Sequence, residues 1–152
     1  LTPNGAKVIE YNSRFGDPET QVVLPLLETD IMDIIEAVWE EKLDTLDIKW
    51  SDKSCACVVM ASGGYPEKYE TGKVISGLDE NGQCEGAFVY HAGTKLEDGK
   101  FLTAGGRVLG ITAYGDTLKE ALDTAYKAVD TISFEKAHYR HDIGKKALSA
   151  LK

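Results

Sequence analysis

The period of apolar and polar positions changes near residue 51, so the two parts of the chain predict different structures. Residues 6–12, AKVIEYN, alternate as a strand does, with polar side chains at positions 10 and 12. Asp17 and Pro18 resemble a helix N-cap and a first-turn proline. We therefore predict a short helix through ETQVVLPLL, which Pro25 should kink or divide.

A clearer helix is predicted from Asp30 to about Leu43. Its apolar residues recur at i, i+3, i+4, i+7 and i+8 and form one stripe: Ile31, Ile34, Ile35, Val38 and Trp39. The stretch DTLDIKWSDKS that follows has no strong period. We therefore place an internal boundary there and expect two parts, residues 1–51 and residues 52–152.

The second part is β-rich. CACVVMAS predicts a strand and GGYPEKYETG a loop, and KVISGL, GAFVYHAGT, KFLTAG and RVLGITAYG predict short β runs between DENGQ and LEDG turns. Thr117 and Glu120 match a capping box. The helix that they open carries one apolar face, formed by Leu118, Leu122, Ala125, Val129 and Ile132. We expect an α+β fold in which this helix covers a small, mostly antiparallel sheet, with a last helix at about 143–151 that contains Gly144.

Length and charge exclude several classes of protein. The 152 residues fit one domain, or a small domain and a piece of another. A formal net charge of -8 argues against a nucleic-acid surface, which needs basic groups to neutralise phosphates. No apolar run approaches the roughly 20 residues of a membrane span, so we expect no membrane segment and a cytoplasmic protein.

The three cysteines are best interpreted as buried, reduced thiols. Their number is odd, and Cys55 and Cys57 share one face of an apolar strand. A zinc site would need better-spaced partners, and the three histidines supply no recognisable pattern.

The candidate chemistry lies in residues 10–19. Glu10, Asn12 and Arg14 point the same way if the strand continues. A carboxylate and an amide carbonyl suit a hard cation such as magnesium near phosphates, and an arginine suits an anion. Asp17 or Glu19 would hold an ammonium or accept its proton. The alternative is an exposed edge strand of ordinary charges, with Asp17 as a helix cap.

Arg107 is a second candidate. It follows Gly105 and Gly106, whose missing Cβ atoms permit close approach of a ligand, so it could bind a sugar phosphate. The alternative is a strand-end arginine after a turn.

Several blocks of the chain resemble one known family. EYNSRFGDPETQ closely resembles the Glu-x-Asn-x-Arg-Phe-Gly-Asp-Pro-Glu-Thr-Gln signature of the phosphoribosylamine-glycine ligases, which are ATP-grasp enzymes of purine synthesis. VVMASGGYPEKYETGKVISGL, VYHAGTK, GGRVLGITAYGDT and YRHDIG resemble that family's C-terminal blocks, in the family's order. The resemblance spans essentially the whole chain.

The resemblance implies a fold and a reaction. Residues 1–51 would end the ATP-grasp catalytic domain, and residues 52–152 would form the C-terminal domain. The family joins glycine to 5-phosphoribosylamine through a glycyl phosphate, giving glycinamide ribonucleotide, ADP and phosphate. Glu10 and Asn12 match its ligands for magnesium, or manganese, on the ATP phosphates. Arg14 and Asp17 match positions beside the reaction centre, and Arg107 is a candidate substrate-binding residue.

The resemblance also implies that this chain alone should not catalyse. The family's ATP-binding lid and phosphate-holding lysines precede the signature, and our chain begins at Leu1 with Met only at 32 and 60. We therefore expect the C-terminal portion of a longer ligase, monomeric or weakly dimeric. The alternatives are a binding or scaffold module from the same family, and another ATP-grasp carboxylase or ligase with a similar C-terminal sheet, against which the GDPETQ sequence argues.

Overall fold

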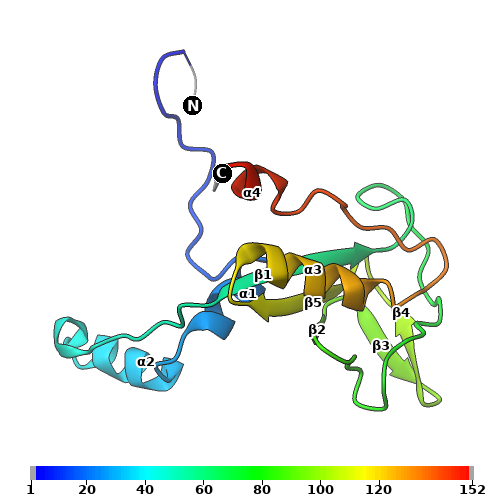
Figure 1. The fold of residues 1–152 in the computed structure, drawn as a ribbon, viewed down its shortest axis with the longest axis horizontal. Coiled ribbons are helices and arrows are strands. Elements are labelled where there is room, and N and C mark those ends of the chain that lie inside the picture. Colours follow the sequence, from blue (N-terminus) through cyan, green and yellow to red (C-terminus); the bar gives the residue numbers. More distant parts are fainter. Residues whose placement is uncertain (1–2, 151–152) are drawn as a thin grey trace.

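A computed structural model describes residues 3–150 and shows an α+β fold (Figure 1). Residues 20–45 form helical segments, residues 54–115 form two small sheets, and two helices follow. The helices are α1 (Thr20–Val23), α2 (Ile31–Trp39), α3 (Leu118–Val129) and α4 (Lys145–Ala150), with short 3-10 helices η1 (Leu24–Leu26) and η2 (Leu43–Thr45). The strands are β1 (Ser54–Ala61), β2 (Phe88–His91), β3 (Thr94–Glu97), β4 (Lys100–Thr103) and β5 (Arg107–Gly115).

All paired strands run antiparallel, as predicted. The main sheet has the order β1-β5-β2, so the last strand in sequence lies at its centre. β3 and β4 form a separate hairpin whose turn holds Asp98 and Gly99, both at positive φ, which confirms the predicted LEDG turn.

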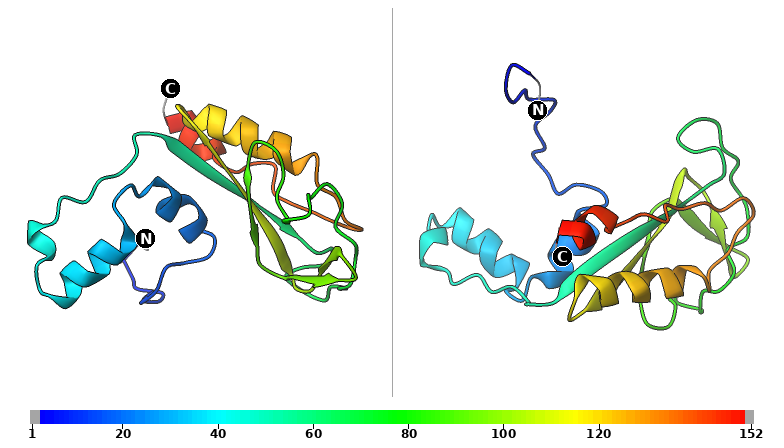
Figure 2. Two further views of the ribbon diagram at one scale, coloured as in Figure 1. Left: turned by 90° about the horizontal axis from the view of Figure 1, so that it is seen from below. Right: turned by 45° about the horizontal axis from the view of Figure 1, so that its top comes forward.

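One face of the main sheet is the core. Ala56, Val58 and Met60 alternate along β1 and are buried, and their partners on β5 are Ala113, Ile111 and Leu109. Residues paired across antiparallel strands share a face, so these six side chains form one apolar surface. Helix α3 covers it with Ala121, Leu122, Ala125, Ala128 and Val129 (Figure 2). The covering helix is therefore confirmed.

The opposite face receives α1. Cys57, Thr112 and Gly110 point to this side by the same alternation. A Cβ at Gly110 would lie 3.2 Å from Cys57 Sγ and 3.9 Å from Gln21 Cγ, so Gln21 of α1 packs directly over this glycine. Figure 2 shows α1 and α3 on opposite sides of β1. The short helix α1 thus lies on one face of the sheet, and the longer helix α3 covers the other.

The sequence segment 6–12 is not a strand, contrary to our prediction. It runs without helix, strand or turn, and Ile9 is 98% exposed. A strand is stabilised by hydrogen bonds to a neighbouring strand, and no described strand lies beside this segment. The polar and apolar side chains of this segment therefore alternate, but the segment lacks the interstrand hydrogen bonds that define a strand.

The first helix also begins later than predicted. Asp17 does not cap it, because α1 starts at Thr20 and its N-cap, Glu19, makes no side-chain capping bond. The prediction that Pro25 divides this helix is confirmed, since η1 begins at Leu24 with proline in its first turn.

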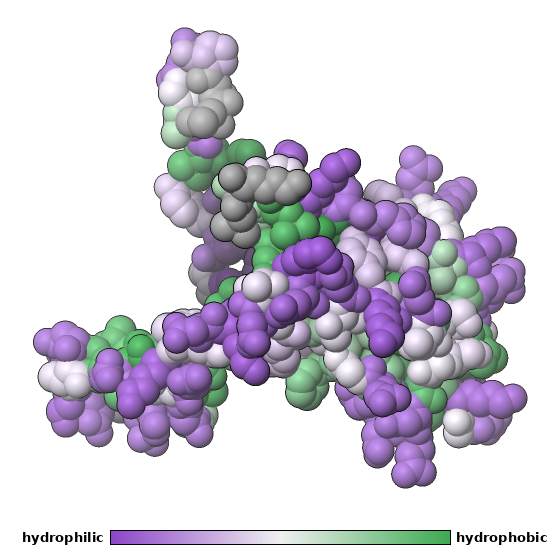
Figure 3. Space-filling view, viewed as in Figure 1, coloured by the Kyte–Doolittle hydropathy of each residue, from purple (hydrophilic) through white to green (hydrophobic). Residues whose placement is uncertain are grey.

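Helix α2 starts as predicted and ends early. Asp30 caps it by accepting a hydrogen bond from the Met32 N–H, but the helix stops at Trp39 and Glu41 takes a positive φ. Its apolar stripe is largely exposed, with Trp39 at 88%, and the arm that carries it extends to the left in Figure 3. No helix within residues 3–150 is long and apolar enough to cross a membrane.

Two further predictions need correction. KVISGL forms no strand, because Val74 and Ser76 make only isolated bridges, to Leu102 and Ser133. The last helix begins at Lys145 and does not contain Gly144, whose φ of 74° is left-handed and lies outside helical geometry.

The capping box of α3 is complete, and it gives a test of local stability. Thr117 Oγ1 accepts from the Glu120 N–H, and the Glu120 carboxylate accepts from the Thr117 N–H. Thr117→Ala removes the first of these bonds and should lower the free energy of unfolding by about 1 kcal/mol, measured by urea denaturation. Thr117→Ser keeps the hydroxyl and should remain close to wild type. Equal midpoints for the alanine variant and wild type would contradict the capping assignment.

Candidate functional site

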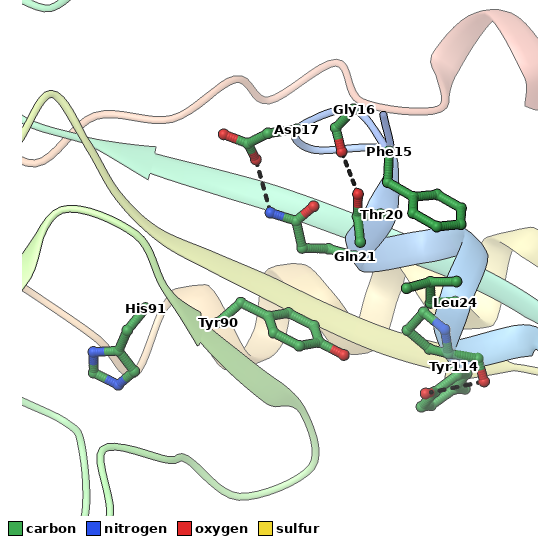
Figure 4. A pocket seen from close by; sticks show the side chains of 10 residues that line it. Phe15, Gly16, Asp17, Thr20, Gln21, Leu24, Tyr90, His91 and Tyr114 are labelled. Carbon is green, nitrogen blue, oxygen red and sulfur yellow. Dashed lines mark hydrogen bonds between the residues drawn. The ribbon is translucent and has the colours of Figure 1, made fainter. Parts of the chain in front are cut away.

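A pocket of about 570 Å³ lies between α1 and the sheet (Figure 4). The turn before α1 and the helix itself line one side, and β2 and β5 line the other. Its residues are Phe15, Gly16, Asp17, Thr20, Gln21, Leu24, Pro25, Tyr90, His91 and Tyr114. We call it the signature pocket, because five of these residues belong to the EYNSRFGDPETQ block.

Two contacts tie the consecutive helices α1 and η1 to the sheet, and one ties α1 to the turn before it. The Tyr114 hydroxyl donates to the Pro25 carbonyl at 3.4 Å, and the Cys55 thiol lies 4.0 Å from the Gln21 carbonyl. Gln21 also donates from Nε2 to Asp17 Oδ1 at 2.7 Å. The helix and the turn before it are therefore tied both to the sheet and to each other.

Asp17 and Arg107, two of the predicted site residues, are in contact. Arg107 Nη1 donates to the Asp17 carbonyl oxygen at 2.8 Å and to Asp17 Oδ2 at 3.0 Å. The Asp17 carboxylate, and to a lesser extent the Tyr65 hydroxyl, raises the pKa of Arg107 above its usual value. Arg107 therefore stays charged, and we call this contact the Asp17–Arg107 clasp.

A second pocket, of about 370 Å³, lies on the other side of the clasp. It is lined by the outer face of β1, the loop after β1 and the segment before α4. These residues are Pro18, Cys57, Val59, Ala61, Tyr65, Pro66, Arg107, His138, Tyr139, Arg140 and Ile143. The side chain of Arg140, one of these lining residues, donates two hydrogen bonds of 2.9 Å to the Asp142 carboxylate. The clasp thus stands between two pockets.

The other three predicted site residues lie away from both pockets. Glu10, Asn12 and Arg14 are exposed on the segment that extends toward the N-terminus (Figure 1). Arg14 Nη1 donates to the carbonyl of its neighbour Phe15 at 2.8 Å. The structure therefore joins Asp17 and Arg107 but does not bring the two candidate metal ligands to them.

The donor atoms of Glu10 and Asn12 nevertheless fit a hard cation. Magnesium prefers carboxylate and carbonyl oxygens, and near phosphates it takes only one or two protein ligands. Within residues 3–150 no group of three His, Cys, Asp or Glu side chains comes together in a way that could hold a metal by itself. An ion at Glu10 and Asn12 would thus depend on further oxygens, such as those of a phosphorylated substrate.

Several pocket residues were missed from the sequence. Val89, Ile111 and Ala113 are in the core, so strict alternation places Tyr90 and Tyr114 on the pocket face. That pattern was available in the sequence. His91 is packed as expected, because its ring nitrogens contact Thr94 Oγ1 and the Gly82 carbonyl, each at 2.8 Å.

The chain is similar to known ligases along nearly its whole length. The family described as phosphoribosylglycinamide synthetase, C domain, matches residues 55–146. A phosphoribosylamine--glycine ligase of Caldanaerobacter subterraneus subsp. tengcongensis is 55% identical over 143 residues, which cover 94% of this chain and 34% of that protein. One from Synechocystis sp. is 50% identical over 150 residues, covering 97% and 36%.

A solved structure agrees with these sequence matches. The crystal structure of phosphoribosylamine--glycine ligase from Thermotoga maritima superposes with a TM-score of 0.70 and 34% identity, covering 89% of this chain and 32% of that one. The α+β fold and the sequence matches agree in pairing this chain with the C-terminal part of these ligases. The chain belongs to the phosphoribosylglycinamide synthetase C-domain family, and it spans about a third of the length of the curated relatives it matches.

All three cysteines are free thiols, as the reduced-thiol interpretation expects, but only Cys57 is buried, whereas Cys55 and Cys84 are partly exposed. Cys55 and Cys57 lie on the pocket side of β1. Burial raises the pKa of the Cys55 thiol from 9.0 to about 11, with a smaller contribution from Cys57. Burial also raises the pKa of Cys57. Both thiols are therefore protonated at neutral pH and poorly nucleophilic.

This shift predicts a loss of stability at alkaline pH. Between about pH 9 and pH 11 the unfolded Cys55 thiol is ionised while the folded one is still neutral. The free energy of unfolding should therefore fall as pH rises through this window, and it should be independent of Cys55 below it. Urea denaturation of wild type and Cys55→Ser from pH 7.5 upward should show a smaller fall for the variant. Parallel curves for the two proteins would refute the shift, and Ser54→Ala serves as the control that keeps the thiol.

Proposed function

We propose that this chain is the C-terminal part of an ATP-dependent ligase that joins glycine to 5-phosphoribosylamine. The products would be glycinamide ribonucleotide, ADP and phosphate, formed through a glycyl phosphate, in purine synthesis in the cytoplasm. ATP, glycine and 5-phosphoribosylamine are the proposed substrates, with magnesium or manganese as the metal.

The observation that carries this proposal is the extent of the similarity. Identity of 50–55% runs through 94–97% of this chain in two relatives that bear the ligase name. Two others are named as bifunctional purine biosynthetic proteins, one from Dictyostelium discoideum and one from Pichia angusta, each 50% identical. The match therefore includes the signature block as well as the sheet.

The proposed roles follow from donor chemistry. Glu10 and Asn12 would hold the metal, which neutralises charge on the phosphates during transfer. Arg14 would contact the acyl phosphate, because a guanidinium can donate two parallel hydrogen bonds to an anion. Asp17 and Arg107 each line one of the two pockets that border the signature turn, beside the proposed reaction centre.

The proposed division of the chain follows the same reasoning. Residues 1–51 would complete an ATP-grasp catalytic domain, and residues 52–152 would be the C-terminal domain packed on it. The exposed Glu10, Asn12 and Arg14 would then meet ATP held by the rest of the ligase. A non-catalytic module is the less favoured alternative, because it would not need to retain Glu10 and Asn12.

The metal assignment can be tested in the full-length ligase. Replacing both Glu10 and Asn12 with Ala should abolish metal-dependent ADP release, because the ion then loses both protein ligands. The thermal midpoint should stay close to wild type, since both side chains are exposed. Lys7→Ala, on the same exposed segment, is the control and should remain active. Unaltered turnover in the double variant would disprove the assignment.

A second experiment tests whether this part acts alone. The isolated 152-residue chain, supplied with ATP, magnesium, glycine and 5-phosphoribosylamine, should release no glycine-dependent ADP, because the proposed ATP site lies outside it. The full-length ligase provides the positive control. Sustained turnover by the isolated chain would contradict the proposed division of labour.

A further inference from the structure

The Asp17–Arg107 clasp joins residues 90 positions apart in the sequence. One nitrogen of Arg107 contacts both the main-chain carbonyl and the side-chain carboxylate of Asp17. A donor that holds the backbone and the side chain of the same residue restricts its orientation more than a side-chain contact alone. The clasp therefore fixes the turn as well as pairing two charges.

Asp17 is held from its other side too. Its Oδ1 accepts from Gln21 Nε2 at 2.7 Å, so both carboxylate oxygens are engaged. The Thr20 hydroxyl donates to the Gly16 carbonyl within the same turn. With a contact on each of its carboxylate oxygens, Asp17 is arranged to hold the turn in place.

The glycines that precede Arg107 are themselves held by hydrogen bonds and by packing. Ser62 Oγ donates to the Gly105 carbonyl and the Ser62 N–H to the Gly106 carbonyl, each at 2.8 Å. A Cβ at Gly106 would clash with Tyr65 Cδ2, so the Tyr65 ring packs directly on this glycine. The loop after β1 thus holds the strand end from which Arg107 projects.

The clasp is close to the predicted reactive residues. Three peptide units separate Arg14 from Asp17, which places their Cα atoms no more than about 11 Å apart. Residues 6–13 have no neighbouring strand in the part of the chain that the structure describes. Asp17 is thus the first residue after Arg14 that long-range side-chain contacts fix to the sheet.

We propose that Arg107 and Asp17 are positioning residues, which set the direction in which the segment carrying Glu10, Asn12 and Arg14 leaves the sheet. This inference rests on the proposed ligase function and deepens it. The C-terminal sheet would thereby control the geometry of phosphoryl transfer without contacting the phosphates. Arg107 would then act through Asp17, whereas a phosphate-binding arginine would act on the substrate directly.

Steady-state kinetics of the full-length ligase separate these roles. Arg107→Ala should lower kcat by roughly 10- to 100-fold, because small misplacements of reacting groups cost factors of this size. The KM for 5-phosphoribosylamine should change by less than about threefold. Asp17→Asn should reproduce this pattern, and Arg107→Lys should recover part of kcat because it keeps one charged donor.

The double variant tests whether the two residues act as a unit. Arg107→Ala combined with Asp17→Asn should be no slower than the slower single variant, since each change already breaks the charged side-chain contact of the clasp. A large rise in the KM for 5-phosphoribosylamine with unchanged kcat, or multiplied losses in the double variant, would overturn the proposal. Lys119→Ala, which breaks the exposed pair with Asp123 on α3, is the matched control and should be wild type in every measurement.

Hydrogen exchange gives a readout that does not depend on activity. In the full-length protein, Arg107→Ala and Asp17→Asn should each speed amide exchange in residues 10–17, whereas Lys119→Ala should not. Unchanged exchange would refute the clasp even in an active ligase. Absence of glycine-dependent ADP release by the wild-type protein would instead refute the proposed function, and the exchange data would still decide whether the clasp orders the segment.

Discussion

The antiparallel pairing of β1 with β5 is the constraint on which the rest of the structure depends. Paired residues share a face, so one register assigns every side chain of both strands either to the core or to the pocket side. Ala56 and its neighbours at every second position bury against α3, and Cys57 with Gly110 faces α1. A slip by one residue would exchange the two faces. The core and the pockets are thus consequences of the same pairing.

The two sides of the sheet are held by different forces. Burial of apolar side chains holds α3, and this force has little directionality. Directional hydrogen bonds hold the turn before α1, where Arg107 and Gln21 meet Asp17. Such contacts between partly exposed groups add little to global stability, because water competes for them. They specify orientation instead, which is the property that a reactive segment needs.

Local sequence patterns predicted the elements whose causes are local. The Thr117–Glu120 capping box, the helix start at Asp30, the division at Pro25 and the strand at Cys55 depend on neighbours in sequence, and each is found. The prediction of a strand at residues 6–12 was wrong, because alternation indicates a strand only where another strand pairs with the segment. The Asp17–Arg107 contact could not be deduced, although both residues were candidates, because it depends on where two distant turns meet in space. The roles of Glu10, Asn12 and Arg14 stay predictions, since the structure leaves all three exposed.

Helix α2 differs from α3 in how it keeps its shape. Its nine residues have an N-cap and a nearby bridge between Leu27 and Trp50, but its apolar side chains are mostly in water. Helices this short are marginal in water without tertiary packing. The molecule therefore contains a gradient of local opening free energies, low in α2 and approaching that of global unfolding at β1 and β5. We therefore expect residues 31–39 to lose and regain helical structure while the sheet stays intact.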